Sequence, residues 1–552
     1  MNYIKQSIWA LAAITLVACS SDDDKDTTES LPQVENTPTS FSASIESGNP
    51  ASSKATRTTL VTDDGDSPYP VWAANDQLHV YNATTPANAL FTMKSTEYVG
   101  QRQGVFEGTI TRNTGDKFFA LYCSTLTGDG APTLTASNST ATISATIPSA
   151  LVNYTAGFHP EYHFMTACTT GNAFKFKNAM SLIRIDISNN SYANFVIRKI
   201  HFKAINGENI AGAFTASIGD DGTIGTPTIT GGSSEITVSN SNGSAISPGV
   251  YYIPVLPSTL SGGFTLTFEN TEDGAIYERS NTRTNFTIAK SEIIDLGSFT
   301  AQACAKEAYV DLGITNSSGQ KLLWSVENIY DEGFTDEDSF YSWGETSVKA
   351  NQGKTGENAT YSWYCSSTSG ENNRAYKYGY GGSSNRYNIS GGTLTKYNTN
   401  TNYGSTDSKT VLDTTDDVAY VKSNGKWRMP SAADFKALTD SATAINAATG
   451  QEITAGRNFV GGPAEDTNNT KYKIRNKKTN HYILFPMRGY KFKESATGNE
   501  YLNTTGGYYW TRELATTVQA KFYHLSTNGT TVGEIDNIQR CRGFMVRGVM
   551  YR

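Results

Sequence analysis

Charge is scarce in this chain of 552 residues. Lys, Arg, Asp and Glu together make up 18% of it, and the formal net charge is −7. A protein that binds nucleic acid needs a positive surface to displace the counterions of the phosphates. The acidic balance therefore excludes nucleic acid from the expected partners.

The motifs of the common enzyme classes are missing as well. The sequence has no HExxH, no GxSxG and no dinucleotide-binding fingerprint, and its Gly353-Lys354-Thr355 lacks the first glycine of a phosphate-binding loop. The six histidines are scattered, and Pro160 between His159 and His163 argues against a helix that would point both at one metal. Because no nucleophile–base pair or pair of acids stands out, we do not expect an enzyme.

Cysteine is sparse, and its spacing is not that of a metal site. Apart from Cys19, no CxxC pair occurs among the remaining five, which are Cys123, Cys168, Cys304, Cys365 and Cys541. An odd number leaves at least one thiol free or paired between chains. We expect zero to two structural disulfides outside the cytoplasm, and the favoured link joins Cys304 or Cys365 to Cys541.

The first residues carry the pattern of a lipoprotein signal. Lys5 and the apolar run at 8–14, which is too short to span a bilayer stably, precede the segment LVAC at 16–19. Small residues before a cysteine suit a lipoprotein signal peptidase, so residues 1–18 are predicted to be removed and Cys19 to be lipidated. Several acyl chains, at ~0.8 kcal/mol per buried CH₂, would then anchor the protein in a membrane. The alternative is an ordinary cleaved signal in which Cys19 occurs by chance.

Residues 19–40 are polar and acidic and predict a flexible tether. The aspartates at 22–24 resemble the surface-export signal of lipoproteins in gut and oral Gram-negative bacteria. The expected location is therefore the cell outer membrane, with the protein facing outward.

From residue 41 to residue 302, short apolar or alternating runs are separated by Gly, Asn and Asp. Typical runs lie at 41–45, 78–81, 118–122, 182–187, 251–255 and 264–268. This pattern favours β-strands joined by polar turns. We predict a mainly β chain that begins with two β-sandwich domains, at 41–172 and 173–302.

Residues 303–552 are denser in aromatic residues and contain one clear helix. Pro430 and Ser431 open this helix, and Asp434 stands three positions after Ser431, where a capping box needs an acceptor. The apolar stripe expected on the helix is Phe435, Leu438, Ala442 and Ile445. We predict a helix that packs on the core of a separate α+β domain.

An ordered set of short motifs covers the first half of the chain. The motifs are FSA at 41–43, ATRT at 55–58, VW at 71–72, NDQLHVY at 75–81, VFEG at 105–108, FALY at 119–122, FKFKNAM at 174–180, YYIPV at 251–255 and IDLG at 294–297. In this order they resemble the fimbrillin family of lipoprotein pilins and accessory fimbrial proteins. The resemblance implies two transthyretin-like β-sandwiches. The chain departs from the family at two positions. It has Asn178 where the family often has His, and Cys123 where the family usually has Pro.

A second set of motifs covers residues 303–552. It consists of YVDLG at 309–313, YSWGET at 341–346, LD at 412–413, DDVA at 416–419, WRMPS at 427–431, FPMRGY at 485–490, GGYYW at 506–510 and VR at 546–547. This set resembles the major paralogous domain (FISUMP-type) family, which is thought to be C-type-lectin-like. The resemblance implies a C-type-lectin-like adhesin domain more firmly than it implies an activity.

The two resemblances together predict a fimbrial subunit at the tip of a fimbrium, with a C-terminal domain that binds host or microbial ligands. In fimbrillins an Arg-directed protease removes the N-terminal segment, and a strand from another subunit fills the groove by donor-strand complementation. Arg57 fits such a processing site, and an uncut surface arginine is the alternative. Residues 544–552 are expected to close the C-terminal domain and so are not free for donation. The alternative function is a monomeric surface lipoprotein that binds glycans.

The predicted ligand surface is a stretch rich in Tyr, Gly, Asn and Ser. Flat rings with amide and hydroxyl neighbours suit the faces of sugars, although the same rings could instead pack long loops. The predicted ligand-binding residues are Tyr361, Trp363, Tyr364, Tyr376, Tyr378 and Tyr380. The neighbouring carboxylates Asp416 and Asp417 could bind Ca²⁺, with turn and capping roles as the alternative.

Overall fold

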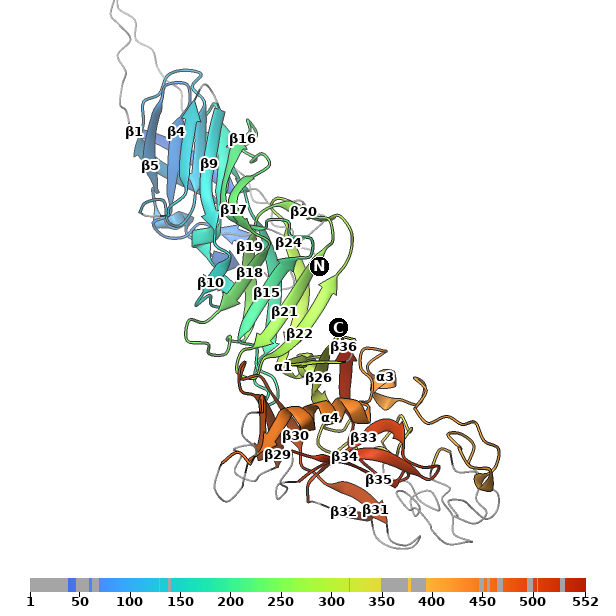
Figure 1. Ribbon diagram of the computed structural model, residues 1–552. Coiled ribbons are helices and arrows are strands. Elements are labelled where there is room, and N and C mark those ends of the chain that lie inside the picture. The colour runs from blue at the N-terminus through green and yellow to red at the C-terminus, as the bar shows by residue number, and fades with distance from the viewer. Residues whose placement is uncertain are drawn as a thin grey trace, which may run out of the picture.

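The computed structural model describes residues 38–45, 59–61, 69–128, 130–137, 140–316, 318–348, 376–378, 394–445, 451–453, 457–463, 470–493, 500–503, 505–526 and 532–552. In this part of the chain the fold is mainly β, as predicted. The molecule is elongated, with N-terminal sheets at one end, further sheets in the middle and a C-terminal unit at the other end (Figure 1). None of the described helices is long and apolar enough to cross a membrane.

The N-terminal unit is built on a closed sheet of seven strands. In order these strands are β1 (Pro38–Ile45), β13 (Ala173–Asn178), β12 (Met165–Thr169), β7 (Phe118–Tyr122), β4 (Gln77–Asn82), β5 (Ala87–Met93) and β6 (Gln103–Thr109). Every residue of β7 is buried, because its two faces contact different cores. Phe118 belongs to the core of the closed sheet and Phe119 to the neighbouring core, as the alternation of side chains along a strand requires.

A second sheet lies beside the closed one and mixes strands from distant parts of the sequence. Its order is β17 (Thr228–Ser233), β16 (Ala211–Ile218), β9 (Thr140–Ile147) and β8 (Thr133–Ser137). Strands β13 and β16 both follow residue 172, yet β13 pairs with β1 and β16 pairs with β9. The predicted domain boundary between residues 172 and 173 therefore does not coincide with a break between sheets. Strands from both sides of this boundary pair in the same sheets, and a local sequence pattern does not reveal such pairing.

The middle unit is built mainly on two sheets. One has the order β11 (Gly157–Phe158), β19 (Gly249–Val255), β14 (Ser181–Asn189) and β24 (Ile293–Thr300). The other has eight strands, β10 (Ala150–Val152), β18 (Glu235–Ser239), β15 (Lys199–Ala204), β21 (Phe264–Asn270), β22 (Ala275–Asn281), β25 (Tyr309–Thr315), β26 (Lys321–Asn328) and β36 (Arg547–Tyr551). Alternate residues of β21 are buried, as expected for a strand with one face on a core.

The eight-stranded sheet runs without interruption from the middle unit into the C-terminal unit. Strand β22 pairs with β25, which places Ala275 opposite Val310 and Ile276 opposite Tyr309. An ion pair of 2.7 Å between Arg552 and Glu278 reinforces this junction. The last strand, β36, pairs antiparallel with β26, so the C-terminal segment closes this unit as expected.

The rest of the C-terminal unit consists of small sheets and short helices. The sheets are β27 (Ala442–Ala444), β28 (Phe459–Pro463), β29 (Lys471–Asn476) and β30 (Tyr482–Pro486), then β31 (Tyr490–Lys493) and β32 (Glu500–Asn503), and β33 (Gly507–Leu514), β34 (Gln519–Leu525) and β35 (Glu534–Gln539). The described helices include α1 (Ala301–Ala305), α3 (Val418–Lys422) and α4 (Ala432–Ser441). Figure 1 shows α4 lying across these sheets.

Helix α4 confirms the helix predicted from the sequence. Ser431 is its N-cap, and both hydrogen bonds of the capping box with Asp434 are present. Phe435 and Leu438 are buried, with the Phe435 ring stacked on Tyr523 at 4.4 Å between centroids. The helix ends at Ser441, so the last two residues of the predicted stripe fall outside it, the first of them in β27.

The cysteines correct one expectation. Cys123, Cys168 and Cys304 form no disulfide, whereas Cys541 is in one. A link between Cys304 and Cys541 is therefore excluded, and the partner of Cys541 lies outside the described residues. Burial raises the pKa of the Cys304 thiol to about 12, which keeps it protonated and unreactive.

Candidate functional site

A cleft of about 770 Å³ opens on the C-terminal unit beside the last strand of the chain. Its walls come from the turn between β25 and β26, from α3 and α4 with the segment between them, and from β33 and β36. We call it the arginine cleft. The polar and aromatic residues that define it are Asn316, Gln320, Tyr420, Arg428, Arg512 and Tyr551.

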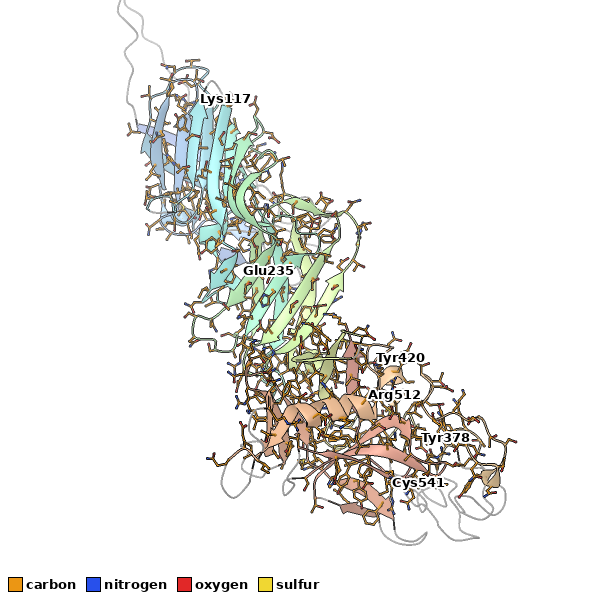
Figure 2. The ribbon with its side chains drawn as sticks, viewed as in Figure 1. Lys117, Glu235, Tyr378, Tyr420, Arg512 and Cys541 are labelled. Atoms are coloured by element: carbon orange, nitrogen blue, oxygen red, sulfur yellow. The ribbon has the colours of Figure 1, made fainter. Side chains whose placement is uncertain are left out.

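Backbone hydrogen bonds fix the positions of the two arginines. The N–H of Arg428 donates to the carbonyl of Val549 at 3.0 Å, and the N–H of Val549 donates back at 2.9 Å, so the α3–α4 segment is tied to β36. The N–H of Arg512 donates to the carbonyl of Pro430 at 3.0 Å. Residues far apart in the sequence thus meet on one surface, and Figure 2 shows Arg512 next to Tyr420 near α3 and α4.

Tyr551 is the centre of the polar contacts in the arginine cleft. The guanidinium carbon of Arg428 lies 4.3 Å from the centroid of the Tyr551 ring. The Tyr551 hydroxyl donates a hydrogen bond to Oδ1 of Asp434, whose Oδ2 accepts the backbone N–H of Ser431 at 2.8 Å. Burial and this bond to Asp434 raise the pKa of the Tyr551 hydroxyl, although the two nearby arginines oppose the shift. Both oxygens of Asp434 are therefore engaged within the protein.

The two guanidinium groups have no carboxylate partner among the described residues. No ion pair within 4.0 Å joins Arg428 or Arg512 to any described Asp or Glu, and no described side-chain or backbone acceptor receives a hydrogen bond from either guanidinium. The Nε of Arg512 is buried and lacks a hydrogen-bond acceptor in this part of the chain. A third cation on the rim, Lys426, is by contrast bound to Glu307 through its carbonyl at 2.8 Å and its carboxylate at 3.3 Å. The cleft therefore holds two arginines that the fold leaves available to an anion.

Two of the predicted ligand-binding tyrosines are structural. Tyr376 and Tyr378 are each 3% exposed, and they pack in the aromatic core of the C-terminal unit. Their hydroxyls donate to the carbonyls of Trp343 and Gly344, each at 2.8 Å. Neither ring offers a face to a ligand, which corrects the prediction for these two. The other four predicted residues lie outside the described part of the chain, and are Tyr361, Trp363, Tyr364 and Tyr380.

The carboxylates considered for Ca²⁺ serve structural roles instead. Asp416 accepts hydrogen bonds from Lys377 at 2.7 Å and from Lys396. Burial alone would raise the pKa of Asp416, but these lysines lower it well below its ordinary value. Asp417 is the N-cap of α3 and accepts the backbone N–H of Met429 at 2.9 Å. In the described ranges no cluster of three or more His, Cys, Asp or Glu could hold a metal ion, and each carboxylate oxygen of Asp416 is already paired with a lysine ammonium group.

The sequence prediction missed the arginine cleft, although one signal was present. Arg428 belongs to the WRMPS motif and Arg512 stands two positions after GGYYW, but the cleft appears only when β36 brings Tyr551 beside them. The predicted lipidation site Cys19 and processing site Arg57 lie outside the described residues, so both stay predictions.

Comparison with protein-family models and with curated proteins finds no match. Among solved structures, the chain is similar to a "putative cell adhesion protein" from Bacteroides uniformis, at 16% identity and a TM-score of 0.28 over 42% of this chain and 88% of that one. It is similar to a fimbrial protein from Bacteroides ovatus, at 8% identity and a TM-score of 0.22 over 93% and 99% of the two chains. The fimbrial anchor protein Mfa2 from Porphyromonas gingivalis matches at 9% identity and a TM-score of 0.21, over 45% and 83%. The chain thus resembles cell adhesion and fimbrial proteins only distantly, and its function has to be argued from its own residues.

Proposed function

We propose that this chain is a cell-surface fimbrial subunit, located at the tip of a fimbrium, that accepts a strand from another subunit and binds a ligand through its C-terminal unit. It reaches the outer membrane as a lipoprotein acylated at Cys19. A protease then cuts after Arg57 and releases the lipid anchor. The position of β1 is the observation that carries this proposal.

Strand β1 lies between β6 and β13 in the closed sheet of the N-terminal unit. It pairs antiparallel with β6, where Pro38–Ser44 lie opposite Gln103–Thr109, and parallel with β13, where Ser42–Ile45 lie opposite Ala173–Phe176. Residue 57 lies between β1 and the next strand, β2 (Thr59–Val61). A cut after Arg57 therefore leaves β1 attached by non-covalent contacts alone.

The side chains of β1 show what its departure exposes. Phe41 is fully buried, and its ring centroid lies 5.3 Å from Phe91, 5.2 Å from Phe118 and 4.8 Å from Phe174. Without β1, the facing edges of β6 and β13 lose their partners and these three rings line an open groove. An extended segment with an apolar residue in place of Phe41 would restore both the hydrogen bonds and the packing.

The other end of the chain supports an acceptor role. Strand β36 is paired with β26, and Val549 at its centre is fully buried. Donating this strand to another subunit would unfold the core of the C-terminal unit, so the chain can accept a strand but cannot give this one. A subunit with that asymmetry belongs at the end of a polymer.

The replacement Arg57→Ala tests this function. We expect the variant to keep residues 19–57 and its lipid, and to be absent from purified fimbriae, as measured by mass spectrometry of the fimbrial and membrane fractions. The matched control is Lys54→Ala, which removes a basic residue three positions earlier and should assemble normally. Assembly of Arg57→Ala at the level of the unmodified chain would refute the processing step. Recovery of the unmodified chain from membranes alone would favour a monomeric glycan-binding lipoprotein.

A further inference from the structure

The arginine cleft combines features that select one class of ligand. Its lining carries three cations, Lys426, Arg428 and Arg512, and one carboxylate, Asp434, on a chain whose overall charge is −7. Lys426 and Asp434 are already bound within the protein. The charge that remains for a ligand is that of two arginines, so the ligand carries negative charge.

The form of the arginines favours a planar anion. A guanidinium presents five N–H donors in a fixed plane and matches a carboxylate with two parallel hydrogen bonds. The Tyr551 ring lies 4.3 Å from the guanidinium carbon of Arg428, which limits the orientations of that group. The N–H of Arg512 at Nε is buried without an acceptor among the described residues. An oxygen of a bound anion would supply one.

The remaining walls favour a sugar over a protein surface. Tyr420 is 40% exposed, and its ring offers an apolar face of the kind on which the C–H face of a pyranose packs. The amides of Asn316 and Gln320 stand on the same rim and can both donate to and accept from hydroxyls. A concave cleft of about 770 Å³ has the size of a small-molecule site. Protein partners usually bury about 800 Å² on each side of a broader contact.

We infer that the arginine cleft binds a carboxylate-bearing glycan, with the carboxylate held by Arg428 and Arg512 and a neighbouring ring packed on Tyr420. This inference rests on the proposed ligand-binding role of the C-terminal unit and names the class of ligand. It does not depend on Arg57 or on assembly, because the cleft lies within one chain. Binding can therefore be measured on the full-length monomer, and a failure of the processing or assembly step leaves this inference standing.

Isothermal titration of the full-length chain with matched pairs of sugars tests the inference. The pairs are a galacturonic acid trisaccharide with its neutral galactose counterpart, and sialyl-lactose with lactose. We expect at least one acidic sugar to bind at least tenfold more tightly than its neutral partner, and to bind more weakly as salt is added. A hexaglutamate peptide serves as the third probe. Equal binding of acidic and neutral sugars, or tighter binding of the peptide, would overturn the inference.

Variants assign the binding to the two arginines. Arg428→Gln and Arg512→Gln should each weaken binding of the acidic sugar by about 10- to 100-fold, the usual loss for a hydrogen-bonded charge, and should weaken binding of the neutral sugar less. Lys436→Gln is the matched control, because it removes one positive charge from α4 at a side chain that is 67% exposed and outside the cleft. Unchanged melting temperatures establish that the variants fold, and Arg428→Lys gives a second, milder change at the same place. Full affinity in both Gln variants would refute the assignment.

Discussion

Replacing Phe41 by Ala should destabilise the closed sheet of the N-terminal unit by about 3–5 kcal/mol, the usual cost of truncating a fully buried Phe. The structure supports a value near the middle of this range. The ring is fully buried and contacts three other aromatic rings, which favours a high cost. The strands on both sides of β1 could move inward and fill part of the cavity, which favours a lower one. Because 1.4 kcal/mol is a factor of ten, a cost of about 4 kcal/mol should make opening of the sheet about 10³-fold more frequent.

Hydrogen exchange read by mass spectrometry localises this effect to the strands on either side of β1. Peptides that cover Gln103–Thr109 and Ala173–Asn178 should lose protection in Phe41→Ala, whereas peptides from α4 should not change. The control is Val99→Ala on the same unit, whose side chain is 41% exposed and whose loss should be nearly neutral. Unchanged protection of β6 and β13 in Phe41→Ala would show that β1 does not hold this sheet together, and would remove the structural basis for a groove opened by cleavage.

Three further predictions concern the middle and C-terminal units. Ser431→Ala removes the hydroxyl that accepts from the N–H of Asp434 at 3.1 Å and should cost about 1 kcal/mol, measured by chemical denaturation; Ser431→Asp should restore most of it. Asp273→Asn should change the pH dependence of stability, because burial raises the pKa of Asp273 to about 7 in the folded protein. The folded state therefore holds this proton more tightly than the unfolded state, so the contribution of Asp273 is full only below about pH 4, where both states are protonated, and is lost progressively as the pH rises from there to about 7. The neutral Asn should raise the melting temperature at pH 8 and have little effect near pH 4, and an equal change at both values would contradict this reasoning. Cys541→Ser breaks a disulfide and should lower the free energy of unfolding by about 2–5 kcal/mol, whereas Cys304→Ser, at a buried free thiol, should respond in the same way with and without reductant.

Features that depend on neighbouring residues could be predicted from the sequence. The capping box of Ser431 and Asp434 is a contact over three positions, and α4 begins where that pattern places it. The strand at 118–122 is apolar at every position, and it lies between two cores. Such signals are local, because propensity and periodicity act over a few residues.

Features that depend on long-range pairing could not be predicted in this way. Nothing in the segment at 173–178 indicates that it pairs with β1, more than 120 positions earlier, and not with the strands that follow it. The density of aromatic residues near Tyr376 and Tyr378 predicts a ligand-binding surface. In the fold these two rings pack in a core instead, because their hydroxyls donate to backbone carbonyls. The arginine cleft needs β36 beside the α3–α4 segment, and this juxtaposition exists only in the fold.

The uninterrupted sheet between the middle and C-terminal units has a mechanical consequence. In the proposed role, a ligand held beside β36 and pulled away from the cell would load β36, β26, β25 and β22 in turn, through hydrogen bonds between neighbouring strands. Two domains joined by a flexible linker would swing freely under the same pull. Here the force acts on a sheet that both units share, with the ion pair between Arg552 and Glu278 at the junction. The C-terminal unit would therefore resist bending and transmit tension to the rest of the chain.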